Sequence, residues 1–174
     1  MTAKKASKNA IESASGFFSI TAEVNGRPLT LQVGEGEFLL DALRRHGLKG
    51  AKKGCETGDC GSCTILVEGQ PMLSCLMLAV QAHGRKITTI EGLGSPRHPH
   101  PIQEAFVKAG AVQCGYCIPG MILATKALLD ANPSPSEEEI RYGLDGNLCR
   151  CTGYVKQVEA VKDAARTLKN ARSK

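Results

Sequence analysis

The chain has 174 residues, which is enough for one or two small domains with a modest core. Only 4% of the residues are aromatic and none is tryptophan, which argues against a nucleic-acid binder that stacks bases on aromatic side chains. The formal net charge is +5, but the basic residues cluster only in the first eight and the last nine residues, as is typical of solvated termini.

The N-terminal residues 1–16 are basic and rich in small side chains, and no apolar segment of the kind found in signal peptides follows them. No apolar run elsewhere approaches the length of a transmembrane helix. We therefore expect a flexible extension over residues 1–16, no membrane span and a cytoplasmic protein. Because disulfides are rare in the cytosol, the eight cysteines of the chain favour metal binding.

Residues 17–94 are predicted to form an α+β domain. Their apolar patterns predict four strands, at residues 17–24, 29–33, 64–69 and 86–92. The first two strands are expected to form a hairpin, because residues 25–28 (NGRP) are typical of a turn. The apolar residues of 38–47 have helical spacing, and Gly47 suits the position after the last turn of such a helix.

Three prolines in residues 95–101 predict a linker between this domain and a helical one over residues 102–168. Four helices are expected there, at residues 102–110, 121–131, 137–144 and 154–168. Ser136 and Glu139 form the capping-box pattern at the start of the third helix. Four short helices indicate a bundle, which a tail over residues 169–174 follows.

The first four cysteines follow the plant-type [2Fe–2S] spacing C-x4-C-x2-C…C. They are Cys55, Cys60, Cys63 and Cys75. The loop between them is rich in glycine, which permits positive φ angles and a close approach of backbone N–H groups to sulfur. The alternative is a structural zinc site, but zinc sites more often pair two short C-x2–4-C motifs. The spacing therefore favours iron–sulfur, and this half of the chain resembles a β-grasp ferredoxin.

The last four cysteines lie in two separate loops. They are Cys114, Cys117, Cys149 and Cys151. Each pair precedes an expected helix, and the positive N-terminus of a helix stabilises a negative cluster. Zinc remains an alternative for this group by ligand count alone.

Three stretches together resemble the signature of a known family. QCGYCIPGM and GNLCRCTGY around the second group, with GCETGDCGSCTILVEGQPMLSC around the first, resemble the iron–sulfur subunit of molybdenum hydroxylases. This is the family of xanthine oxidase, carbon monoxide dehydrogenase and 4-hydroxybenzoyl-CoA reductase. The resemblance covers residues 17–165 and all eight cysteines. Tyr116 and Ile118 stand where many relatives have Phe and Thr, but neither side chain is a ligand.

The resemblance implies a fold and a role. The fold is an N-terminal β-grasp [2Fe–2S] ferredoxin-like domain followed by an all-α four-helix [2Fe–2S]-binding domain. The role is an oxidoreductase subunit that passes electrons from molybdopterin in a large subunit, through two [2Fe–2S] clusters, to FAD in a medium subunit. The complex would be a hetero-oligomer, a dimer of heterotrimers, without nucleic acid.

By the same resemblance, Gln113 hydrogen-bonds the pterin, and Cys151 both ligates iron and lies near the pterin. The chain itself is expected to hold no catalytic residue, because the substrate site belongs to the large subunit. A zinc-stabilised interaction module and a free-standing ferredoxin are the alternative functions.

Overall fold

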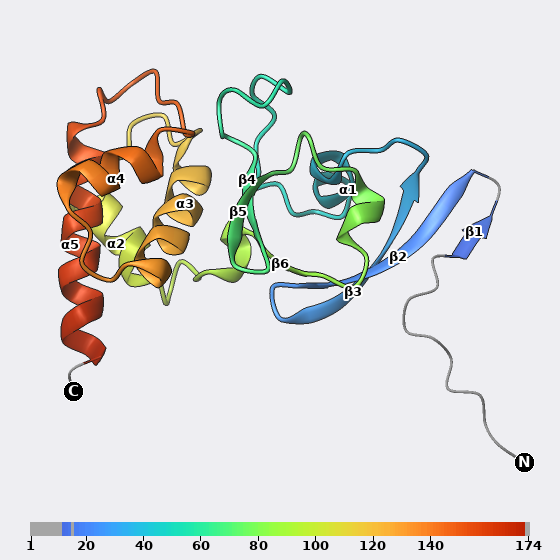
Figure 1. Cartoon of the computed structure of the whole chain (residues 1–174), viewed down its shortest axis with the longest axis horizontal. Helices are drawn as coiled ribbons and strands as arrows, with labels where there is room; N and C mark the ends of the chain where they lie inside the picture. The colour runs from blue at the N-terminus through green and yellow to red at the C-terminus, as the bar shows by residue number, and fades with distance from the viewer. Residues whose placement is uncertain (1–11, 15, 173–174) are drawn as a thin grey trace, which may run out of the picture.

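The computed structural model describes residues 12–14 and 16–172, and Figure 1 shows a sheet half and a helical half side by side. The strands are β1 (Glu12–Ala14), β2 (Phe17–Val24), β3 (Arg27–Gly34), β4 (Thr64–Val67), β5 (Gln70–Leu73) and β6 (Lys86–Thr88). They form one sheet in the order β1-β2-β6-β4-β5, and β3 also pairs with β2. The sheet half also holds helix α1 (Leu39–Arg45) and the 3-10 turns η1 (Ala79–Ala82) and η2 (Ile90–Gly92).

The β2–β3 hairpin turns tightly at two residues. Asn25 and Gly26 have φ angles of 53° and 77°, as a type I′ turn requires, and Val24 pairs with Arg27 across it. Strand β6 runs parallel to β2 and antiparallel to β4, with Ile87 facing both, so β6 joins the hairpin to the rest of the sheet.

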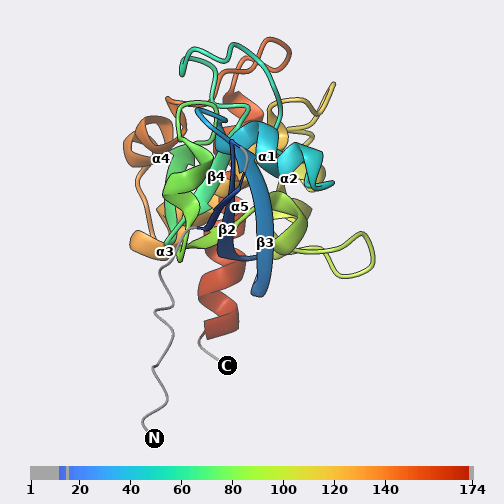
Figure 2. The same cartoon turned by 90° about the vertical axis from the view of Figure 1, so that its right-hand side faces the viewer.

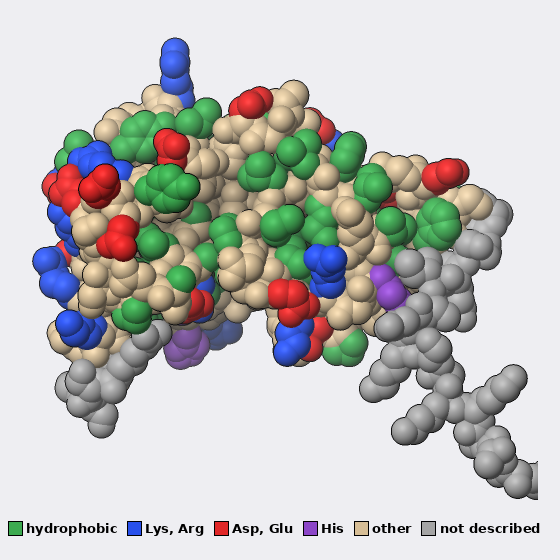
Figure 3. All heavy atoms as spheres, in the orientation of Figure 1, with side chains coloured by type: hydrophobic (Ala, Val, Ile, Leu, Met, Phe, Trp, Pro, Cys, Tyr) green, Lys and Arg blue, Asp and Glu red, His purple; other side chains and the backbone are tan. Residues whose placement is uncertain are grey.

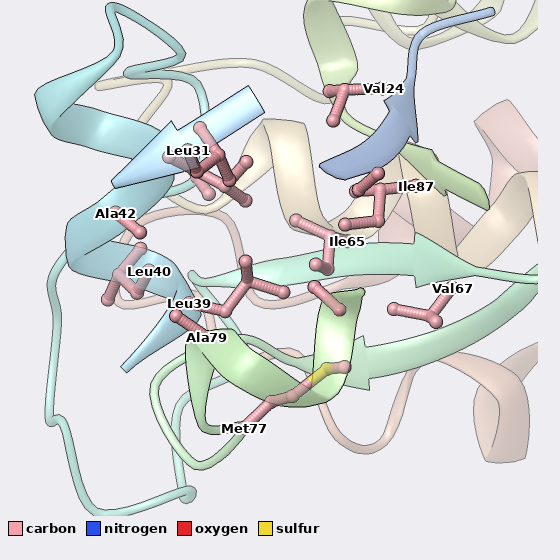
Figure 4. Packing of buried hydrophobic residues seen from close by; sticks show 14 of the residues in the cluster. Val24, Leu31, Leu39, Leu40, Ala42, Ile65, Val67, Met77, Ala79 and Ile87 are labelled. Carbon is pink, nitrogen blue, oxygen red and sulfur yellow. The ribbon is translucent and has the colours of Figure 1, made fainter. Parts of the chain in front are cut away.

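Helix α1 packs its apolar side against this sheet. The side chains of α1 meet those of β3, β4 and β6 in the core, where Leu40, Leu31, Ile65 and Ile87 are almost fully buried (Figure 4). Gly47 follows the helix with a φ of 86°, the left-handed conformation expected of it. A mixed sheet grasping one helix is the β-grasp arrangement, which confirms the fold expected for this half.

Strand β5 was not expected from the sequence. Glu68 and Gly69 have φ angles of 51° and 80° and form a second tight hairpin turn, so residues 70–73 return alongside β4. Pro71 is tolerated in β5 because this strand lies at the edge of the sheet. The strand expected over 86–92 is shorter, because its chain enters the 3-10 turn η2.

Residues 12–14, within the extension expected to be flexible over residues 1–16, form a strand. Glu12 pairs with Ser19 of β2 in the antiparallel strand β1, whereas residues 1–11 and 15 lie outside the described part. The reason is that β6 pairs with only the last two residues of β2, Glu23 and Val24. The backbone groups at the start of β2 are therefore left open to another strand on that side.

The helical half contains α2 (Pro101–Lys108), α3 (Ile118–Ala131), α4 (Glu137–Leu144) and α5 (Val155–Arg172). Their buried faces share a second core, separate from the first, that includes Phe106, Met121, Ile140 and Val161. The helix at 118–131 starts three residues earlier than expected, because Pro119 fits its first turn. Among the described residues, no helix is both long and apolar enough to cross a membrane.

Two helix starts are fixed by side-chain caps. Ser136 Oγ accepts from Glu139 N at 3.2 Å, and Glu139 Oε2 accepts from Ser136 N at 2.7 Å, which confirms the capping box of α4. His100 Nδ1 accepts from Ile102 N at 3.2 Å and caps α2, a role that the sequence did not reveal.

Candidate metal centres

All eight cysteines are free thiols in loops, outside the helices and strands. The loop that follows α1 lies beside the loops that precede α3 and α5 in both Figure 1 and Figure 2. The two expected cysteine groups thus come close to each other, although the sequence separates them.

The first site contains two pairs of thiols. Cys55 N donates to Cys60 Sγ at 3.4 Å, and Cys60 N donates to Cys55 Sγ at 3.3 Å. The loop can close this tightly because residue 54 is glycine. A Cβ at that position would lie 2.6 Å from Cys60 Sγ. Hydrogen bonds from Thr57 and from the Cys60 backbone lower the pKa of Cys55 to about 6. A sulfur that already accepts several N–H groups is suited to carry the negative charge of a metal-bound thiolate.

The other pair of the first site is buried. Ser74 Oγ donates to Cys63 O at 2.7 Å, which holds Cys63 beside Cys75. Burial, followed by the neighbouring Cys63 thiol, raises the pKa of Cys75 to about 11. Metal binding to this pair therefore has to displace protons from the thiols.

The second site also contains two pairs of thiols. Each pair joins one cysteine of the loop before α3 to one cysteine of the loop before α5. Cys114 and Cys151 are exposed, and their sulfur atoms lie 3.5 Å apart. Cys117 is buried beside Cys149, and burial, followed by this neighbour, raises the pKa of Cys117 to about 12. One pair thus faces solvent and the other faces the interior.

Four thiols grouped in two pairs fit a [2Fe–2S] cluster, in which each iron takes two terminal thiolates. Among the residues described, no three Cys, His, Asp or Glu side chains gather around one point that could hold a metal ion. The sequence-predicted cysteines are thus brought together as pairs, and their roles as ligands stay predictions.

The two cysteine loops touch through their backbones. Leu148 N donates to Cys60 O at 2.9 Å, which joins the residue before Cys149 to a cysteine of the first site. Buried Asn147 donates from Nδ2 to Gly61 O at 2.9 Å and lies 3.2 Å from Thr64 Oγ1. This contact places the first site directly beside the second.

Gln113, next to Cys114, is exposed and has no hydrogen-bond partner among residues 12–14 and 16–172. Its amide group is therefore free to bind a group outside the chain. Asn147 lies within the quoted stretch GNLCRCTGY, but its role was not predicted, because the sequence does not distinguish a buried asparagine from one in a solvated turn.

Two family models match the chain. One describes a 2Fe-2S iron-sulfur cluster binding domain and covers residues 22–86, and the other describes a [2Fe-2S] binding domain and covers residues 89–162. The nicotinate dehydrogenase small FeS subunit of Eubacterium barkeri is 47% identical over 153 residues, which are 87% of this chain and 98% of that protein. The chain belongs to the iron–sulfur small subunits of the molybdenum hydroxylases.

Other members of the family extend this result. The nicotine 6-hydroxylase small subunit of Paenarthrobacter nicotinovorans is 51% identical and is matched over 92% of its length, with 87% of this chain covered. The crystal structure of quinoline 2-oxidoreductase from Pseudomonas putida 86 superposes with a TM-score of 0.86 at 45% identity, over 90% of this chain and 98% of that chain. The expected family, the expected fold and the role of an oxidoreductase subunit that binds [2Fe–2S] clusters are confirmed.

Proposed function

We propose that this chain is the electron-transfer subunit of a molybdenum-dependent hydroxylase, with its eight cysteines as the ligands of two [2Fe–2S] clusters. A [2Fe–2S] cluster supplies one-electron transfer when it is bound. The observation that carries the proposal is the hydrogen bond between Leu148 N and Cys60 O, because it makes the two cysteine sites a continuous path.

The exposure of the thiols gives this path a direction. The exposed pair of the second site, Cys114 and Cys151, lies beside exposed Gln113, whereas Cys149 of the inner pair adjoins the link to Cys60. We infer that electrons enter at the exposed pair, where Gln113 hydrogen-bonds a pterin held by a large subunit and Cys151 lies near that pterin. They leave through the first site toward FAD in a medium subunit.

The surface around the cysteines suits such partners. Leu76, Tyr116 and Leu148 each lie within one residue of a cysteine and are between 47% and 54% exposed. Apolar side chains are also exposed over the sheet half, and acidic and basic side chains are interspersed on the helical half (Figure 3). Exposed apolar groups beside both sites are typical of a protein interface. The family relation supports a hetero-oligomer, and we infer a dimer of heterotrimers in the cytoplasm, where reducing conditions keep thiols free.

The composition of the native protein tests this function. We expect about four iron atoms and four acid-labile sulfides per chain, and two EPR signals after reduction. Zinc without labile sulfide, or a single cluster, would contradict the proposal and favour the zinc-stabilised module. A native protein that elutes from cell extract without a large subunit would favour a free-standing ferredoxin.

Substituting Gln113 by alanine should leave both clusters in place but slow their reduction by substrate in the complex, by about tenfold for one lost hydrogen bond. Stopped-flow bleaching of the cluster absorbance measures this rate. Gln70→Ala is the matched control, because Gln70 is an exposed glutamine at the start of edge strand β5. Equal reduction rates in the Gln113→Ala and Gln70→Ala complexes would refute the pterin contact.

A further inference from the structure

The sulfur of Cys149 accepts a hydrogen bond from a side-chain hydroxyl. Thr152 Oγ1 lies 3.1 Å from Cys149 Sγ, and the backbone N–H of Cys151 donates to the same sulfur at 3.4 Å. Cys149 belongs to the inner pair of the second site and adjoins the link to the first. A donor on this sulfur therefore acts where an electron passes between the two sites.

Gln157 of α5 fixes the direction of that hydrogen bond. Its side chain is fully buried, and its Nε2 donates to Ala111 O at 3.3 Å and also to Thr152 Oγ1. A carbonyl oxygen only accepts, so the Nε2 end of the amide has to face Ala111. The second N–H of the amide then occupies a lone pair of the Thr152 oxygen. The single hydroxyl hydrogen of Thr152 is left to point at the Cys149 sulfur.

The same side chain joins the two loops of the second site. Ala111 lies three residues before Cys114, and Thr152 follows Cys151, so Gln157 is bonded to both cysteine loops. Its Oε1 is buried without a hydrogen-bond partner among the described residues. A buried oxygen without a partner destabilises the fold, and an apolar side chain of similar size would avoid that cost. This cost indicates that a glutamine at residue 157 is needed for its two N–H hydrogen bonds, not for the packing of the core.

The first site has a threonine of its own beside a cysteine. Thr57 follows Cys55 by two residues, and its hydroxyl lies 2.5 Å from Asp59 Oδ2. The Thr57 side chain also hydrogen-bonds Cys55 and lowers the pKa of that thiol. Thr57 therefore provides a matched threonine whose hydroxyl acts on a cysteine of the first site and not on the second site.

We propose that Gln157 and Thr152 are positioning residues that raise the reduction potential of the cluster in the second site, by holding a hydroxyl donor on the Cys149 sulfur. This inference rests on the proposed ligation of that cluster by Cys114, Cys117, Cys149 and Cys151. Reduction adds one electron to the cluster, and no proton moves, because the hydroxyl keeps its hydrogen. The added negative charge strengthens the hydrogen bond, so the donor stabilises the reduced form more than the oxidised form.

The test is a redox titration of the cluster-loaded complex, followed by EPR, with the second signal identified by its loss in Cys117→Ser. At a fixed potential, Thr152→Val should shift the ratio of reduced to oxidised second cluster about tenfold toward the oxidised form, which is about 59 mV for one electron. Thr152→Ser keeps the hydroxyl and should titrate like the unmodified chain. Gln157→Leu should shift the second cluster in the same direction by a smaller factor, and Thr57→Val should leave it unchanged.

A Thr152→Val complex with both clusters and an unchanged second potential would overturn the inference. So would a Thr152→Ser complex whose potential shifts as far as that of Thr152→Val. If the Thr152→Val complex loses the second cluster, the potential of that cluster in the Gln157→Leu complex becomes the test. An unchanged potential in the Gln157→Leu complex also overturns the inference. Absence of the second cluster from the unmodified chain would instead contradict the proposed function.

Discussion

A Cys60→Ser chain is expected to lose the cluster of the sheet half and to keep that of the helical half, with about half of the iron and labile sulfide retained. Serine is a poorer iron ligand than a thiolate, and Cys60 forms the first pair of thiols with Cys55. The carbonyl of residue 60 that accepts from Leu148 N belongs to the backbone and survives the substitution. The second site should therefore remain intact.

Cys117→Ser is the reciprocal variant, because Cys117 lies in the buried pair of the second site. It should remove the second cluster and leave the first. Iron analysis, labile sulfide and EPR of the reduced proteins measure both outcomes. Loss of both EPR signals in either variant, with far-UV circular dichroism unchanged, would contradict the division of the cysteines into two independent groups.

Gly61→Ala should destabilise the contact between the two halves by about 2 to 5 kcal/mol. Gly61 has a φ of 68°, which is strained for alanine, and an added Cβ would lie 2.0 Å from Gly146 O and 2.9 Å from Asn147 Cα. Backbone atoms cannot rotate away as a flexible side chain does. The loop of the second site would have to withdraw from the loop of the first, which also breaks the Asn147 hydrogen bond to Gly61 O.

Gly110→Ala is the matched control for this substitution. Gly110 has a similar φ of 65°, but an added Cβ there would meet nothing within 4 Å. It should cost only the backbone strain of about 1 to 2 kcal/mol. Denaturant unfolding measures both free energies, and the magnetic interaction between the reduced clusters in EPR reports their separation. Equal destabilisation by the two variants, with the magnetic interaction unchanged, would show that the contact at Gly61 does not hold the halves together.

Most of the secondary structure could be predicted from the sequence, because its signals are local. Alternation over 17–24 predicted β2, and the Ser136–Glu139 pattern predicted both the start and the cap of α4. The spacing of Cys55, Cys60 and Cys63 was a local signal too, since ligands that share a loop keep a fixed spacing, whereas the resemblance joined the two loops of the second group. Strand β5 was missed because residues 70–73 form a strand, with Pro71 in it, only at the edge of the assembled sheet.

The sequence by itself determined the two cysteine motifs, the two kinds of fold and the family, since each depends on residues near one another in the chain. Only the tertiary structure decided that Cys114 pairs with Cys151, that Asn147 bonds to Gly61, and that Gln157 directs the hydroxyl of Thr152. The first two contacts join residues 37 and 86 positions apart. Such distant partners are selected by the packing of two separate cores against each other, and no local pattern of residues records that packing.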